Sequence, residues 1–323
     1  MSAPILYSLC RSRPRNAHVP LIAHAPEPGK TSSGPCEGDD LARSDGCATM
    51  PRPRRRREHN TLLEQDRMIP YGEPGPLTEM ERFVFDSVGY LIIPDALSQD
   101  ETAAAREACD RVHEGLPTDQ WRQLGATFER EPALERIVDH PSILPKARAL
   151  FGDKFILQSS WATVVPPGFT GGGIHQDGSS AFEFRNLATP TPLVQLRTGF
   201  VLTDQSAPGA GNMVLLPGSH NTGHPLPSGA TIMDFPTAHM VTASPGAALM
   251  FHQGVYHCGS GNTRDYPRHM FHTIYAPPWL NHTDRMTTSP GFLERTTPMR
   301  RALMGAWTHD TESFHMSPLP FDD

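Results

Sequence analysis

The chain has 323 residues, enough for one large domain or two ordinary ones, and 37% of them are hydrophobic, which suffices for a core. A formal charge of -7 gives no overall attraction to nucleic acid or to an anionic membrane, and no apolar run approaches the roughly 20 residues that span a bilayer. Composition therefore excludes a membrane-spanning protein and disfavours a nucleic-acid-binding one.

Residues 1–75 differ in composition from the rest of the chain. They are rich in Pro, Arg, Ser and Gly and have hardly any aromatic residues, which predicts a disordered N-terminal extension. A basic cluster within residues 52–57 is typical of a solvated tail, although a nucleic-acid contact or a localisation signal has the same appearance. Translation could also begin at Met50 or Met68, so residues 1–67 are either part of the natural protein or a segment ahead of it.

The cysteine content points to a reducing environment. The five cysteines match neither a zinc motif nor a disulfide framework, and arginines interrupt the N-terminus before any signal-peptide core forms. We therefore expect free thiols and a cytoplasmic protein.

The folded domain is predicted over residues 76–323 and begins with helices. Residues 78–87 have helical spacing and end before Gly89, a capping box at Ser98 and Glu101 starts a helix that runs to about Glu114, and residues 134–150 form a helix broken by prolines. The apolar residues that give the first helix its helical spacing are Met80, Phe83, Val84 and Val88.

Strand-like segments follow from about residue 155 to 280. Most of these segments are bounded by Gly or Pro, and they are Phe155–Val165, Val194–Thr203, Met213–Leu216, Ala247–His252 and Met270–Tyr275. One further strand-like segment, Tyr90–Ile93, lies earlier, between the first two helices. Helices followed by many short strands favour a mainly β fold with buttressing helices, a double-sheet jelly roll.

A glycine-rich stretch carries the first metal-ligating pattern. His175 and Asp177 lie two residues apart, so on an extended strand both side chains point to the same side. One imidazole and one carboxylate form two parts of the facial triad of non-haem iron oxygenases, which a second imidazole completes.

A second block supplies the missing groups. His257 follows Asp177 by eighty residues, and Arg268 follows His257 by eleven. Alternation in the strand after His257 places Arg268 and His272 on one face, and a guanidinium there suits a carboxylate held at two points. His252 precedes His257 by five residues and is the alternative third ligand, and the residues alone leave this choice open.

Together these blocks resemble the phytanoyl-CoA dioxygenase family of Fe(II)/2-oxoglutarate oxygenases over roughly residues 80–280. The resemblance implies a double-stranded β-helix and a dioxygenase that decarboxylates 2-oxoglutarate to succinate and CO2 with O2. It assigns His175, Asp177 and His257 as catalytic metal ligands and Arg268 as the cosubstrate anchor. It also places Phe200 and Trp161 beside the cosubstrate.

The chain departs from the family where a serine commonly helps to hold the cosubstrate carboxylate. Gly259 occupies that position, so Ser260 or Thr273 is expected to replace the hydroxyl. The expected function is hydroxylation of a small organic substrate. Desaturation, epoxidation or cyclisation at the same iron, and a metal-binding jelly-roll protein without catalysis, are the alternatives. The sequence identifies neither the substrate nor the oligomeric state.

Overall fold

The computed structural model describes residues 69–178, 183–280, 288–306, 309–310 and 315–321. The basic cluster and both alternative start methionines lie outside the described residues. Residues 69–75 are already part of the fold, because Tyr71 pairs with Ile92 and the carbonyl of Pro70 accepts a hydrogen bond from the Ile92 amide. The described fold thus includes several residues ahead of the predicted boundary at residue 76. No helix in the described ranges is long and apolar enough to cross a membrane.

Short helices and strands alternate along the described chain. The helices are α2 (Glu79–Val88), α3 (Gln99–Val112), α4 (Pro132–Glu135), α5 (Leu144–Phe151), α6 (Pro290–Arg295) and α7 (Pro298–Leu303). The strands are β1 (Tyr90–Ile93), β2 (Arg122–Gly125), β3 (Ile156–Val165), β4 (Leu196–Val201), β5 (Met213–Leu215), β6 (His239–Met240), β7 (Ala248–His252), β8 (His257–Gly259), β9 (Arg268–Ala276), β10 (His309–Asp310) and β11 (His315–Met316).

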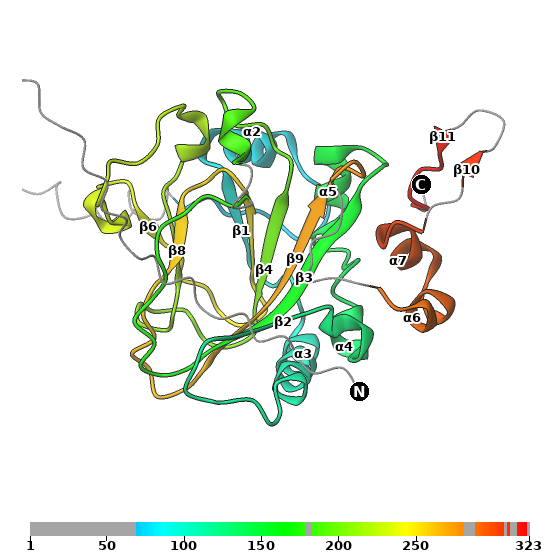
Figure 1. Cartoon of the computed structure of the whole chain (residues 1–323), viewed down its shortest axis with the longest axis horizontal. Helices are drawn as coiled ribbons and strands as arrows, with labels where there is room; N and C mark the ends of the chain where they lie inside the picture. The colour runs from blue at the N-terminus through cyan, green and yellow to red at the C-terminus, as the bar shows by residue number, and fades with distance from the viewer. Residues whose placement is uncertain (1–68, 179–182, 281–287, 307–308, 311–314, 322–323) are drawn as a thin grey trace, which may run out of the picture. The chain divides into compact units, whose positions relative to one another are not determined.

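Two antiparallel sheets form the centre of the fold (Figure 1). Among the described residues, the larger sheet has the strand order β1-β7-β4-β9-β3-β2, and the smaller one has the order β6-β5-β8. An isolated bridge pairs His175 with His257 of β8, so the segment that leads to Asp177 lies along the edge of the smaller sheet. The predicted jelly-roll architecture with buttressing helices is confirmed.

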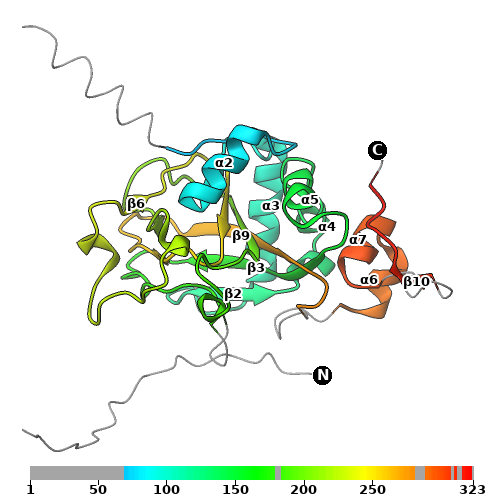
Figure 2. The same cartoon turned by 90° about the horizontal axis from the view of Figure 1, so that it is seen from above.

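One face of the large sheet packs against helices. Leu196 and Phe200 of β4 share a buried cluster with Phe128, Leu134 and Ala105 from the helical segments. Figure 2 shows α3, α4 and α5 grouped on this side of the sheet. Because successive side chains of a strand point to opposite faces, the residues of β4 that alternate with these core positions face the smaller sheet.

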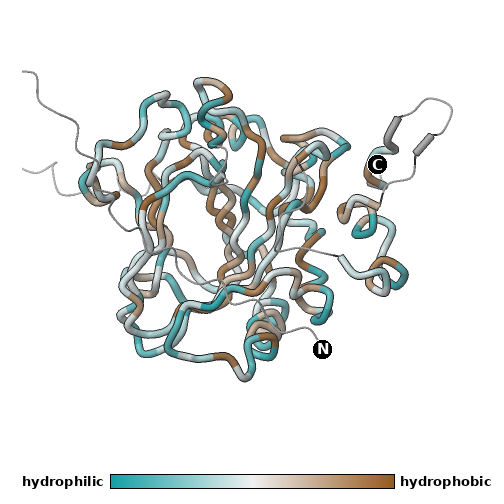
Figure 3. The backbone as a smooth tube through the Cα atoms, in the orientation of Figure 1, coloured by the Kyte–Doolittle hydropathy of each residue, from teal (hydrophilic) through white to brown (hydrophobic). Residues whose placement is uncertain are grey.

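The space between the two sheets is only partly filled by apolar side chains. Tyr90, Leu249 and Phe251 of the large sheet pack with Leu215 and Val255 at one end of this space. Figure 3 shows hydrophobic residues, in brown, along the strands at the centre of the fold. The part of the space bounded by β2, β3 and β9 is lined largely by polar and aromatic side chains, and it holds a cavity.

Helix α2 forms as predicted, and its buried face includes a charged residue. Thr78 and Glu81 make a capping box at its start, and Gly89 ends it in a left-handed conformation with φ of 85°. Met80 and Phe83, two of the residues that give the segment its helical spacing, are 72% and 71% exposed, whereas Phe85 is buried. Glu81 also faces the interior, where its carboxylate lies 2.9 Å from the Nζ of the fully buried Lys146.

Candidate metal centre and adjoining cavity

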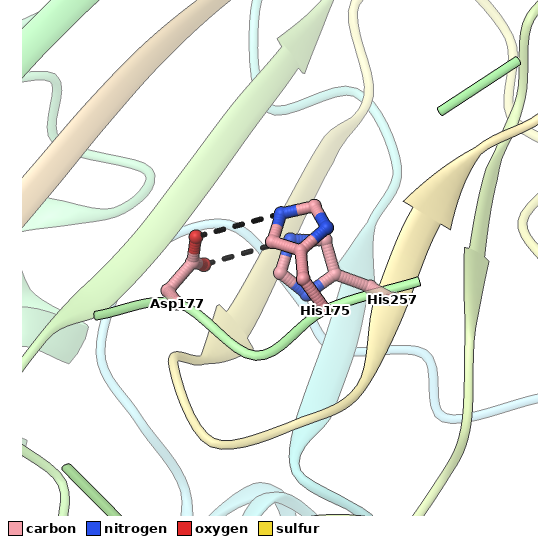
Figure 4. Close-up of side chains that lie close together, drawn as sticks. All are labelled: His175, Asp177 and His257. Atoms are coloured by element: carbon pink, nitrogen blue, oxygen red, sulfur yellow. Dashed lines mark ion pairs between the residues drawn. The ribbon is translucent and has the colours of Figure 1, made fainter. Parts of the chain in front are cut away.

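Three side chains from the edge of the smaller sheet converge on one point (Figure 4). The bridge between His175 and His257 places their rings 4.4 Å apart, centroid to centroid. Asp177 faces both rings, with its Oδ1 3.9 Å from His175 Nε2 and its Oδ2 3.5 Å from His257 Nε2. One ligand atom from each residue lies within 4.8 Å of the others, which is a separation that a single metal ion bridges.

Backbone carbonyls fix the orientation of both imidazoles. His175 Nδ1 donates to the carbonyl of Gly173 and His257 Nδ1 donates to that of Val255, each at 2.9 Å. In neutral histidine this leaves the lone pair on Nε2, the nitrogen that faces Asp177. Hydrogen bonds of this kind orient metal-ligating histidines in proteins. The two histidines are therefore prepared to donate electron pairs to one metal.

Burial favours the neutral, metal-binding form of His257. Its side chain is 5% exposed, and desolvation lowers its pKa to about 4 even though Asp177 acts in the opposite direction. His175 is more open, with 55% of its side chain exposed. The triad thus has one buried imidazole, one carboxylate that is 9% exposed, and one imidazole at the accessible side.

A cavity of about 380 Å3 adjoins the triad between the sheets. The three triad residues line it together with side chains from β2, β3, β4 and β9. Arg268 is among these and is only 5% exposed. Its Nη1 donates to the carbonyl of Gly211 at 2.7 Å, whereas its buried Nε has no hydrogen-bond partner among the described residues.

Arg268 is a buried cation that forms no ion pair with another side chain among the described residues. Burial lowers its pKa to about 10, so the guanidinium stays charged at neutral pH. A buried charge is stable only when it is paired, and a planar guanidinium matches a carboxylate at two points. Arg268 and His272, which alternation places on one face of β9, both line the cavity, together with Ile274, whereas Met270 of the same face does not.

Some of the other residues expected beside the cosubstrate line the cavity, and one does not. Trp161 and Ser260 line the cavity as expected. Phe200 does not; it is fully buried in the helix-side core, because it occupies the opposite register of β4 from Arg197. Its expected position beside the cosubstrate is corrected accordingly.

Thr273 lines the cavity as well, although it lies between Phe271 and Tyr275 of β9, which both belong to the helix-side core. Ser260 and Thr273, the two residues expected to replace the missing serine, thus both border the cavity.

His272 and Trp161 form a stacked wall of the cavity. Their rings are 5.1 Å apart, centroid to centroid, at an angle of 20°. Desolvation lowers the pKa of His272 well below its usual value, and the nearby Arg268 and Arg197 act in the same direction, so the ring is uncharged. Gly199 on β4 makes room for it, because a Cβ there would lie 3.1 Å from His272 Cε1 and 2.6 Å from the methyl group of Met270.

The glycines before His175 allow a close approach of two backbones. Gly171 has φ of +104°, and a Cβ there would lie 3.0 Å from the carbonyl oxygen of Gly259. The amide of Gly172 donates to that same carbonyl at 2.9 Å. These contacts hold the His175 segment against the turn after His257, which brings the two halves of the triad together.

His252, the alternative ligand, belongs to a separate cluster. It is 5% exposed, its ring lies 4.7 Å from that of His220, and its Nδ1 accepts a hydrogen bond from the amide of Gly254. Neither His252 nor His220 lines the cavity. The interpretation of His252 as a core histidine agrees with this placement.

The burial of His252 leads to a prediction about acid stability. Desolvation lowers its pKa from 6.5 to about 3, so the unfolded chain binds a proton at this residue before the native protein does. The stabilisation is complete above about pH 6.5 and is lost as the pH falls toward 3; at pH 5 the cost is about 2 kcal/mol. We expect His252→Gln to flatten the pH dependence of the free energy of unfolding between about pH 7 and pH 5. An unchanged slope would contradict this assignment.

Sequence reasoning missed part of the cavity wall. Trp121 and Gln123 line the cavity from the β2 region, a segment without strand-like alternation, and Phe169 does so from the loop before the glycines. Arg197 carries no distinguishing pattern in the sequence, yet its Nε lies 2.6 Å from Asp177 Oδ2. No local signal in the sequence connects β4 to the aspartate.

Comparisons with known proteins agree with this geometry. Residues 85–270 match the phytanoyl-CoA dioxygenase (PhyH) family. The chain is 23% identical over 235 residues to the ectoine dioxygenase of Sphingopyxis alaskensis, which covers 62% of this chain and 76% of that protein.

Solved structures share the fold at low sequence identity. HygX from Streptomyces hygroscopicus with nickel and 2-oxoglutarate bound has a TM-score of 0.53 at 19% identity, covering 62% of this chain and 88% of HygX. SnoK, a non-haem alpha-ketoglutarate-dependent carbocyclase from nogalamycin biosynthesis, has a TM-score of 0.51 at 24% identity, covering 69% of this chain and 94% of SnoK.

The fold and the family match define a non-haem iron oxygenase. The chain belongs to the phytanoyl-CoA dioxygenase family, since the match spans more than half of its length. It is a 2-oxoglutarate-dependent dioxygenase that uses Fe(II), 2-oxoglutarate and O2. The His-Asp-His donor set fits this metal, and the unpaired Nε of Arg268 in the same cavity fits a dicarboxylate cosubstrate.

Proposed function

We propose that His175, Asp177 and His257 hold one Fe(II), that Arg268 holds the distal carboxylate of 2-oxoglutarate, and that the enzyme hydroxylates a small organic substrate. The observation that carries the proposal is the shared cavity. Metal-facing ligand atoms lie at its edge, and a buried cation lacking a partner on Nε lies within it.

The position of each residue in the cavity determines the role that we assign to it. The bound iron supplies the redox chemistry that couples decarboxylation of 2-oxoglutarate to substrate oxidation. His175, Asp177 and His257 would hold the metal through one ligand atom each, and such a triad leaves coordination positions for other ligands. Arg268 orients the cosubstrate from the far end, and the stacked Trp161 and His272 keep water from that part of the cavity. In the balanced reaction, substrate, 2-oxoglutarate and O2 yield hydroxylated substrate, succinate and CO2.

A substrate screen tests the proposed reaction. Succinate release by the iron-loaded enzyme is measured with a panel that begins with ectoine and hygromycin B, because a similar protein is named for the first and a similar structure contains the second. We expect one compound class to stimulate succinate release and to gain one oxygen atom by mass spectrometry. The same enzyme without Fe(II), or without 2-oxoglutarate, is the control.

Product mass separates hydroxylation from cyclisation, desaturation and epimerisation; epoxidation also adds one oxygen atom and is distinguished from hydroxylation by the structure of the product. SnoK is named as a carbocyclase and SnoN as an epimerase, so this fold also hosts enzymes named for other reactions. A product that has lost two hydrogens would indicate cyclisation or desaturation, and an unchanged mass would indicate epimerisation. Either result would replace hydroxylation while leaving the metal centre assignment intact.

The N-terminal extension is proposed to be dispensable for this chemistry. The described fold begins at Ile69, which packs against the cluster between the sheets, and every proposed site residue lies after it. A chain that starts at Met68 is therefore expected to fold and to retain full turnover. Thermal unfolding and succinate release of the full-length and shortened proteins check this. Loss of cooperative unfolding on truncation would show that the boundary is wrong.

A further inference from the structure

Arg197 forms a close ion pair with the aspartate of the metal centre. It lies on the cavity face of β4, and its Nε is 2.6 Å from Asp177 Oδ2. Both side chains are largely buried, at 13% and 9% exposure. The chain thus places a second cation in the cavity besides Arg268, in direct contact with the carboxylate oxygen nearer to His257.

A buried polar network holds this arginine in place. Arg197 Nη2 donates to Gln195 Oε1 at 3.2 Å, and Gln195 Nε2 donates to Gln158 Oε1 at 3.0 Å. The amide of Gln195 donates to Gln253 Oε1, and the carbonyl of Gln253 accepts from the amide of Asp177 at 3.0 Å. The guanidinium and the backbone of the aspartate are therefore fixed to the same framework.

Two opposing effects follow from a cation at this position. Its charge repels a divalent metal and weakens metal binding. Its contact with Oδ2 also fixes the carboxylate and leaves Oδ1, the oxygen facing His175, available to the metal. The contact between Arg197 and Asp177 is an ion pair rather than a hydrogen bond. Partners that orient a metal-ligating group typically strengthen metal binding by about 10–100-fold, so orientation is expected to outweigh repulsion.

We propose that Arg197 is a positioning residue that makes Asp177 present a single oxygen to the metal. The inference rests on the proposed metal ligands. Held by one oxygen, the carboxylate does not chelate with both, and the positions needed for 2-oxoglutarate and O2 stay open. Arg197 thereby acts on the metal only through Asp177.

Metal binding without turnover tests this role. Mn(II) affinity is measured by calorimetry for the wild type, Arg197→Met and Arg197→Lys. We expect Arg197→Met to weaken Mn(II) binding by about 10–100-fold and Arg197→Lys to recover part of the loss, because an ammonium keeps the charge without the planar fork. The 2-oxoglutarate affinity of the metal-saturated proteins should change little, since Arg268 is intact.

The visible spectrum of the Co(II) protein reports the coordination of Asp177 independently. A carboxylate that is released to chelate with both oxygens raises the coordination number, which lowers the Co(II) absorption. We expect this change in Arg197→Met and not in Arg185→Met. Arg185 is the matched control, because it donates to the Tyr256 hydroxyl at 2.9 Å and contacts no triad residue.

The outcomes are distinguishable. Mn(II) affinity in Arg197→Met equal to or tighter than wild type would overturn the positioning role, because repulsion would then dominate. No Mn(II) binding by the wild type would overturn the proposed metal ligands themselves. If Arg197→Met fails to unfold cooperatively, Arg197→Lys decides: an affinity below that of Arg185→Lys supports the inference, and an equal affinity contradicts it.

Discussion

Replacing any one of His175, Asp177 or His257 by alanine is expected to abolish metal binding and turnover. Two protein ligands remain in each variant, and the lost contact is made directly to the metal. Loss of a residue that only orients a metal ligand typically weakens metal binding by about 10–100-fold. We therefore expect loss of a ligand itself to weaken Fe(II) binding by more than about 100-fold. Anaerobic calorimetry with Fe(II) and succinate release measure the two effects.

Two other histidines serve as controls for these variants. His224 is exposed and outside the cavity, so His224→Ala should bind iron as the wild type does. His252→Gln should also retain iron, because its ring packs on His220 rather than on the triad. Full activity in Asp177→Ala would remove the assignment. Iron binding lost in His252→Gln but kept in His257→Ala would make His252 the third ligand.

Loss of the Arg268 side chain is expected to weaken 2-oxoglutarate binding more than metal binding. A charged, two-point contact in a buried site is worth about 2–5 kcal/mol, which corresponds to about thirty-fold to several thousand-fold in affinity. Arg268→Ala should show this loss in the 2-oxoglutarate concentration dependence of succinate release. Arg268→Lys should recover only part of it, because lysine keeps the charge but not the fork.

Arg264 provides the matched comparison for Arg268. It lies in the turn between β8 and β9, and its Nη2 donates to the carbonyl of Pro208 at 3.0 Å. Its side chain is partly buried, but it does not line the cavity. Arg264→Ala should therefore change 2-oxoglutarate affinity little. The opposite ranking of the two arginines would mean that the cosubstrate anchor is misassigned.

The metal centre was accessible from sequence because its geometry is local. His175 and Asp177 lie two residues apart, and a two-residue period places both side chains on one side of an extended segment whatever the rest of the fold does. The strand after His257 obeys the same period, so the cavity face of Arg268 and His272 was also predictable. The pairing of His175 with His257 is long-range, and only the family resemblance pointed to it.

The failures share a physical cause. Alternation shows which residues of a strand share a face but not which layer that face meets, so Phe200 was placed beside the cosubstrate although it faces the helices. The helical spacing of apolar residues in α2 does not show which face is buried, because Glu81, a polar residue, is buried with its ion-pair partner Lys146. Tertiary partners decide such positions, and the contact between Arg197 and Asp177 belongs to the same class.

Anaerobic visible absorption of the enzyme with Fe(II) and 2-oxoglutarate tests the central assignment most directly, because a 2-oxo acid chelated to Fe(II) gives a charge-transfer band that neither component gives alone. We predict a band that requires both additions and saturates at one iron per chain. It should be absent in Asp177→Ala and should need far more 2-oxoglutarate in Arg268→Ala. A band of wild-type intensity and 2-oxoglutarate dependence in both variants would contradict the assigned site.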